Sequence, residues 1–293
     1  MKHLISNKTL PAEYYEFINA AKKGNIETVK KFLNKPNFDL NYDNGLALYR
    51  AIAHDRPEIV KLLIADPRIN ITFDHNDPIR KAAQSGNPDV VKILLADMRV
   101  DPSDYNNEAI IYATANNYLE IAQLLLNDDR VDPGVSNNEP IHGAVIYGHN
   151  DIVKLLLADD RVNPTASQNY PIRSASEYGH FDVVKTLLAD DRVDPSDYNN
   201  YAVKIAAERK HPNIVKLLLT DSRVDPNYDG RNQVLNKLRK SNDIELLTTL
   251  LKYESVIKDL NKVKTTPNIE NALIGVFDYI KTIDDARVFI MMQ

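Results

Sequence analysis

The sequence predicts an all-α protein built as a solenoid of seven helix-turn-helix repeats. Two columns of identical residues support this prediction, and both have a period of 31 residues. The arginine column comprises Arg68, Arg99, Arg130, Arg161, Arg192 and Arg223, and the alanine column comprises Ala20, Ala51, Ala82, Ala113, Ala144, Ala175 and Ala206. A period between about 20 and 50 residues is typical of stacked supersecondary units. Such a stack offers a long surface and usually no catalytic pocket.

The first helix of each repeat is predicted from apolar spacing. If each unit begins just before this helix, the sixth unit spans 170–200 and its first helix runs from about Pro171 to Tyr178. Ile172, Ala175 and Ser176 then share one buried face. Proline at the second position of three units suits a helix start, because the missing N–H has no helical partner there.

The second helix follows a Gly-His break and runs from about Phe181 to Ala189 in the same unit. Its apolar stripe comprises Val183, Val184, Leu187 and Leu188. A proline six residues beyond the helix, Pro195 in this unit, prevents any helix from continuing. Asn-Asn or Asp-Gly pairs then close most units, and these residues tolerate the left-handed backbone of a tight turn.

The ends of the chain depart from the repeat. Residues 1–14 are interpreted as a lead-in, and residues 15–231 as the seven repeats. Residues 232–252 are a degenerate copy that we expect to cap the stack, followed by a helical C-terminal extension at 253–293. Atypical ends are expected because a terminal unit must hide one face of the stack and expose the other.

Composition excludes several classes of function. The chain has no cysteine, which removes disulfides, thiolate nucleophiles and cysteine metal sites and suits an intracellular, cytoplasmic location. No segment approaches 18 apolar residues, so no membrane contact is expected. A net charge of −5 does not fit nucleic-acid binding. We expect a monomer.

The motifs of the repeat resemble those of the ankyrin repeat family. Glu139-Pro140-Ile141-His142 is similar to the family's helix start, Gly148-His149 and Gly179-His180 to its break, and Ile152–Leu157 to its second helix. The resemblance covers about residues 15–252. The unit of 31 residues is shorter than the family's usual 33. The missing residues precede the first helix, which favours a short, loop-like finger in place of the family's hairpin. Short units of this kind are also similar to arrays of giant viruses and protists, which would place the protein in a host cytoplasm.

Two ladders of polar residues need a structural or a functional explanation. His149, His180 and His211 could indicate a metal site, but stacked repeats hold them roughly 8–10 Å apart, too far to share one ion. A structural role is the preferred interpretation. The arginine column runs beside an aspartate column and could form a charged strip for a partner. We instead expect each arginine to bridge carboxylates and last-turn carbonyl groups within and between units.

The resemblance implies that a target binds the concave side, which is lined by the first helices and the finger tips. The varying first-helix positions expected to be exposed are Arg50, Ala53, His54, Lys81, Gln84, Ser85, Tyr112, Ala115, Asn116, Gly143, Ile146, Tyr147, Ser174, Glu177, Tyr178, Ile205, Glu208 and Arg209. The predicted finger tips include Tyr42, Phe73, Tyr105, Tyr198 and Tyr228. The early face is basic, with Lys22, Lys23, Arg50 and Lys81, and the middle is rich in tyrosine, a residue enriched in interface hot spots.

From these positions we predict partner binding by Arg50, His54, Lys81, Tyr105, Tyr112, Tyr147, Tyr178, Tyr198, Arg209 and Tyr228. The function predicted from the repeat is non-catalytic binding of a protein or peptide, with no cofactor and no metal. The alternative is an adaptor, for example of a ubiquitin ligase, in which residues 253–293 dock a second protein. No phosphate loop, nucleophile elbow or His-Glu-x-x-His motif supports an enzyme.

Overall fold

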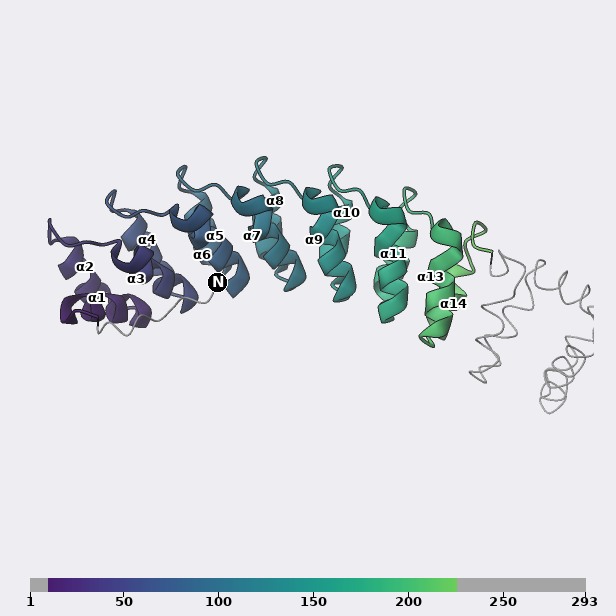
Figure 1. Ribbon diagram of the computed structural model, residues 1–293, viewed down its shortest axis with the longest axis horizontal. Coiled ribbons are helices and arrows are strands. Elements are labelled where there is room, and N and C mark those ends of the chain that lie inside the picture. The colour runs from purple at the N-terminus through teal and green to yellow at the C-terminus, as the bar shows by residue number, and fades with distance from the viewer. Residues whose placement is uncertain (1–9, 226–293) are drawn as a thin grey trace, which may run out of the picture. The chain divides into compact units, whose positions relative to one another are not determined.

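Paired helices follow one another along the chain, as the sequence predicts (Figure 1). The computed structural model describes residues 10–225, and this range contains fourteen helices and no strand. The helices are α1 (Ala12–Lys23), α2 (Ile26–Leu33), α3 (Tyr42–Ala53), α4 (Pro57–Ile64), α5 (Phe73–Ser85), α6 (Pro88–Leu95), α7 (Asp104–Ala115), α8 (Leu119–Leu126), α9 (Val135–Ile146), α10 (Asn150–Leu157), α11 (Ala166–Tyr178), α12 (Phe181–Leu188), α13 (Asp197–Glu208) and α14 (Pro212–Leu218).

The chain divides into two units, Met1–Asp194 and Pro195–Gln293. In the first unit, the odd-numbered helices from α1 to α11 stand side by side as one layer, and the even-numbered helices from α2 to α12 form the second layer (Figure 1). In the second unit, α13 packs on α14. Helix α1 begins at Ala12, inside the stretch expected to be a lead-in. The predicted degenerate repeat at 232–252 and the extension at 253–293 lie outside the described residues.

Small residues allow the first-helix layer to pack closely. The alanine column is buried throughout, with Ala51, Ala82, Ala113, Ala144 and Ala175 fully inaccessible. The second helices bury their valine and leucine stripes, such as Val153 and Leu156 in α10. Each large aliphatic side chain buried in this way contributes about 1.5–3 kcal/mol to folding. The core is therefore one continuous strip between the two layers of the first unit.

A left-handed turn opens every first helix from α3 to α13. Three successive residues in each of these helices have φ between 48° and 72°, for example Tyr105, Asn106 and Asn107. The third residue closes the turn with a backbone hydrogen bond, which for Asn107 reaches the Ser103 carbonyl oxygen at 2.9 Å. The sequence favours a short, loop-like finger over a hairpin at this place. In the described residues the finger is this turn, and it contains no strand.

A buried asparagine compensates for the strained turn. The left-handed region costs a residue other than glycine roughly 1–2 kcal/mol. At the end of each turn from α5 to α13, however, an asparagine side chain accepts a hydrogen bond from a backbone N–H 25 residues further along, as Asn107 Oδ1 does from Asp132 N–H at 2.8 Å. Asn76, Asn138 and Asn169 repeat this bond at 2.7–3.0 Å. The asparagine ladder therefore satisfies buried backbone donors of the following finger.

Candidate functional site

The first-helix face of the first unit carries three groups of predicted site residues. The first group has Arg50 on α3, His54 directly after α3 and Lys81 on α5. A tyrosine group follows, with Tyr112 on α7 and two residues at the ends of α9 and α11, Tyr147 and Tyr178. Tyr105 belongs to the left-handed turn at the start of α7. In the second unit, Tyr198 occupies the equivalent turn of α13 and Arg209 follows its last residue. Tyr228 lies outside the described residues.

Tyr147 and Tyr178 are the most exposed of the predicted tyrosines on the first helices, with 63% and 54% of their surface accessible. Each ring stacks over the histidine two residues further on, at centroid distances of 5.9 Å for His149 and 6.3 Å for His180. Accessible aromatic surface held on a rigid support favours binding, because few rotamers are lost when a partner packs on it.

The supporting histidines have a structural role, as the sequence predicts. The Nε2 atom of His149 lies 3.0 Å from the carbonyl oxygen of Ala115, and that of His180 lies 2.9 Å from the carbonyl oxygen of Ile146. A carbonyl oxygen only accepts, so Nε2 carries the proton in both rings. Each histidine thus ties the end of its own first helix to the unit before it.

Tyr112 differs from the other two tyrosines because its hydroxyl group is engaged. It donates to Glu108 Oε1 at 2.8 Å, and the side chain is partly buried. Burial of the phenol and the adjoining Glu108 carboxylate raise the pKa of Tyr112 to about 12. Both causes favour the neutral hydroxyl. Tyr112 is therefore a fixed donor at physiological pH.

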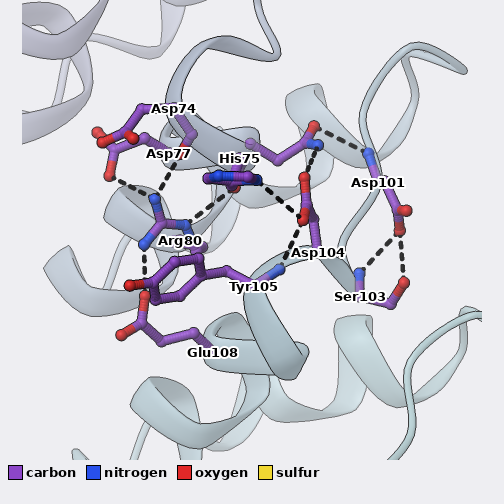
Figure 2. A network of polar contacts seen from close by, with 10 residues as sticks. Asp74, His75, Asp77, Arg80, Asp101, Ser103, Asp104, Tyr105 and Glu108 are labelled. Atoms are coloured by element: carbon purple, nitrogen blue, oxygen red, sulfur yellow. Dashed lines mark hydrogen bonds and ion pairs between the residues drawn. The ribbon is translucent and has the colours of Figure 1, made fainter.

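Arg80 is the centre of a polar network between α5 and α7 (Figure 2). Its guanidinium donates to Glu108 Oε2 at 2.5 Å, to the Asp74 carbonyl oxygen at 2.6 Å and to the His75 carbonyl oxygen at 3.1 Å. Burial opposes the charge, but the hydrogen bond to Glu108 and the nearby carboxylates outweigh it and raise the pKa of Arg80. The network locks the turn of α5 against the first turn of α7.

Tyr105 covers this network. Its ring lies 4.6 Å from the Arg80 guanidinium carbon, and its N–H donates to Asp104 Oδ1 at 2.7 Å (Figure 2). The hydrogen bond from Asn76 is the main cause that lowers the pKa of Asp104. About half of the Tyr105 surface remains accessible, at 53%. The residue is therefore an anchored fingertip with one free ring face.

Two of the sequence expectations about exposure are wrong. Ser174 and Ile205, expected on the accessible face, are each only 4% exposed. At the fingers, Tyr42 stacks on Tyr14 at 4.0 Å, and the Phe73 ring lies against Gly45. A ring that packs on the neighbouring finger keeps little surface for a partner. Tyr42 and Phe73 therefore join units within the stack.

Tyr105 and the tyrosines of α9 and α11 lie at opposite ends of their first helices. Tyr105 lies in the turn before α7, whereas Tyr147 is the residue that ends α9 and Tyr178 is the last residue of α11. A first helix of about eight right-handed residues separates its two ends by roughly 12 Å. Tyr105 therefore lies at the opposite end of the layer from Tyr147 and Tyr178.

Sequence reasoning missed Arg80 and the asparagine ladder. The column of Arg80 holds arginine once more, at Arg173, but also holds Tyr49, Ile111, His142 and Lys204, so no constant residue marks it. The signal for the ladder was present, because Asn76, Asn107, Asn138, Asn169 and Asn200 recur with the same period of 31. The asparagines were interpreted only as residues that tolerate left-handed turns.

The arginine column also has a structural role, as predicted. Arg130 makes two hydrogen bonds to Asp128, at 2.9 Å and 2.7 Å, and a third to the Val100 carbonyl oxygen of the preceding unit at 2.9 Å. Arg161 and Arg192 repeat this pattern with the carbonyl oxygens of Val131 and Val162. The hydrogen bond from the Arg130 side chain is the main cause that lowers the pKa of Asp128. This ladder joins successive units along the edge opposite the histidines.

The described residues offer little evidence of other kinds of site. No three His, Cys, Asp or Glu side chains in residues 10–225 are placed to hold a metal ion. None of the helices in that range has the length and apolarity to cross a bilayer. An open hollow of about 700 Å³ lies on the second-helix layer between α4 and α6, lined by Ile64, Ile93, Met98 and the lysines Lys61 and Lys92.

Comparison with known proteins supports the helical repeat. A family model of ankyrin repeats in three copies matches residues 2–75, 67–137 and 129–199. The ankyrin repeat domain of Bcl-3 is similar with a TM-score of 0.57 and 24% identity, over 70% of this chain and 98% of that domain. The ankyrin repeat protein EF0377 is similar with a TM-score of 0.53 and 23% identity, over 64% of this chain and 100% of that protein. No curated protein matches the chain. At these identities the two structures show the fold alone.

Proposed function

The chain belongs to the ankyrin repeat family, and from this premise we propose that it binds a protein or peptide partner on its first-helix face without catalysing a reaction. Ankyrin repeats are generally protein–protein interaction modules. A shared fold leaves the target open, so the proposal depends on the surface itself.

The observation that carries the proposal is the contrast between the ladders and the tyrosines. Arginine, asparagine and histidine side chains at repeated positions are occupied by contacts between units. Tyr147 and Tyr178 stack on His149 and His180, and more than half of the surface of each tyrosine is exposed. Aromatic side chains that are held rigid but left uncovered resemble the anchors found in interface hot spots.

The test is a triple substitution, Tyr112→Ala, Tyr147→Ala and Tyr178→Ala, in the full chain. Partners captured from the native host by the unaltered chain are quantified against the variant, and circular dichroism checks that the variant is folded. We expect captured partner to fall at least about tenfold, because hot-spot truncations each cost roughly 1–2 kcal/mol.

A matched control removes apolar surface elsewhere. Met98, after α6, is 95% exposed, and Ile26, at the start of α2, is 38% exposed. Met98→Ala with Ile26→Ala should leave partner capture unchanged. Full capture by a folded triple variant would contradict the proposed binding face.

A further inference from the structure

The cations of the first unit divide into two classes. Most arginines and lysines are paired with a carboxylate, including Arg68, Arg80, Arg99, Arg130, Arg161 and Arg192, and the lysines Lys30, Lys31, Lys35, Lys92 and Lys154. Seven others in residues 10–194 form no ion pair with a carboxylate and have no such partner left undescribed: Lys22, Lys23, Arg50, Arg56, Lys61, Lys81 and Lys185. Six of these seven belong to the first three helix pairs, and all of the six except Lys61 of α4 lie at or near the ends of α1, α3 and α5.

These five residues, which we term the basic patch, are Lys22, Lys23, Arg50, Arg56 and Lys81. Contacts between neighbouring helix pairs involve three of them. Arg56 Nε donates to the Lys22 carbonyl oxygen at 3.1 Å, which ties the turn between α3 and α4 to the end of α1. The Lys81 ammonium lies 5.6 Å from the Tyr49 ring, beside Arg50, which ties α5 to α3. Four of the five side chains are exposed, and Lys81 is half-buried.

Helix dipoles do not explain the patch. Cations near a helix C-terminus are favourable by about 0.3–1 kcal/mol. The column that holds Arg50 and Lys81 continues with the uncharged residues Tyr112, Gly143 and Ser174. Helices α7, α9 and α11 fold without these cations. Folding of the repeat therefore does not require them, and their charge is left for another molecule.

We infer that the basic patch binds an acidic segment of a polypeptide partner, so that the partner's carboxylates lie on α1, α3 and α5 and its apolar side chains on the tyrosines of α9 and α11. This inference rests on the proposed function and adds the chemistry of the partner. Five unpaired cations on the first three helix pairs, followed beyond α7 by the half-exposed Tyr147 and Tyr178 of the same layer, complement a segment that is acidic at one end and apolar at the other.

A polypeptide fits better than a nucleic acid. Asp55 lies inside the patch, in the turn between Arg50 and Arg56, and its carboxylate accepts a hydrogen bond from Asn87. Carboxylates also surround Arg80, the residue that precedes Lys81 on α5 (Figure 2). Negative charges at these places would repel a continuous phosphate backbone, whereas a peptide can place its few carboxylates between them.

The experiment uses a library of random 12-residue peptides displayed on phage and selected on the full-length chain. We expect selected peptides to be enriched in Asp and Glu, and the affinity of a representative peptide, measured by fluorescence anisotropy, to fall as salt is raised. Arg50→Glu with Lys81→Glu should weaken that peptide about tenfold and abolish the acidic enrichment in a repeated selection. Lys61→Glu with Lys185→Glu, which removes two unpaired exposed cations on the second-helix layer, should weaken it less than about twofold.

Three results would overturn the inference. Selected peptides with no excess of Asp and Glu would contradict it while leaving the proposed function intact if they still lose binding in the tyrosine triple variant. Equal loss of peptide affinity in the two charge-reversal variants would show that the peptide responds to the overall electrostatic field of the protein and not to a defined site. Displacement of the peptide by a single-stranded DNA oligonucleotide of the same charge, at lower concentration than the unlabelled peptide, would assign the patch to nucleic acid.

Discussion

Single side chains at repeated positions hold neighbouring units together, and Asn107 shows how much one of them does. It is buried and left-handed, and its amide oxygen satisfies the N–H of Asp132 in the following finger. Asn106 beside it has the same φ of 56° but is exposed and makes no such bond. Substitutions at Asn106 and Asn107 therefore distinguish the cost of the left-handed backbone from the stabilisation that the asparagine ladder provides.

Asn107→Ala should lower the free energy of unfolding by about 1–3 kcal/mol more than Asn106→Ala does. Both substitutions place alanine in a left-handed conformation, but only the first leaves a buried N–H without an acceptor. Urea unfolding followed by circular dichroism measures the difference. Equal losses in the two variants would show that the asparagine matters for turn conformation alone.

The Tyr112 hydroxyl provides a second residue-scale test. Burial and the Glu108 carboxylate raise the pKa of Tyr112 to about 12. Glu108→Gln removes the negative charge and leaves the burial, so the pKa of Tyr112 should fall but stay above 10. Titration of ¹³C-tyrosine resonances, with Tyr112→Phe to assign the signal, measures this. Glu120→Gln on α8 is the matched control and should leave the pKa of Tyr112 unchanged.

The element scale is set by how each helix pair ends. Standard capping does little, since of the fourteen helices described only α2 and α6 have an asparagine side chain that accepts from the first turn. The ends of the second helices are instead covered by the arginine column. Arg192, for example, donates to the carbonyl oxygens of Leu157 and Val162 while it holds Asp190. One planar guanidinium thereby joins three segments.

Arg130→Lys should destabilise the protein by about 1 kcal/mol, because an ammonium group cannot hold Asp128 at two points and the Val100 carbonyl oxygen at once. Arg50→Lys, at an unpaired and exposed position, should cost almost nothing. Thermal unfolding of both variants measures this.

The same ladder predicts acid sensitivity. Arg130 lowers the pKa of Asp128 from its ordinary value of 3.8, so the stability that this ion pair contributes is present above pH 3.8 and is lost as the pH falls through the lowered pKa.

At the scale of the whole molecule, stability is a sum over neighbouring pairs. Every ladder contact between units joins residues 25 to 35 positions apart, which places the partner in the adjacent unit. None of them skips a unit. A repeat protein of this kind tolerates the loss of an internal unit as long as the register of the remaining contacts is kept.

Deletion of residues 108–138, one period of 31, should therefore give a folded protein of lower melting temperature. The deletion places Glu139 directly after Asn107, so each ladder finds the same partner type in the next unit. Deletion of residues 108–137 is the matched control. It leaves one residue too many, and shifts every later side chain out of register. Equal helicity and melting behaviour in the two variants would contradict the nearest-neighbour account.

The sequence by itself determined the repeat, the two helices of each unit and the structural role of the arginine and histidine columns, because identical residues at a fixed period must meet identical surroundings in a stack. It also placed Tyr147 and Tyr178 on the accessible surface. Only the tertiary structure decided which varying positions are covered. Ser174 and Ile205 are buried, and Tyr42 and Phe73 pack on neighbouring fingers. Arg80 is held by Glu108, whereas Arg50 is left unpaired. These outcomes depend on the side chains of adjacent units, about 28–31 residues away, which no local pattern within one unit contains.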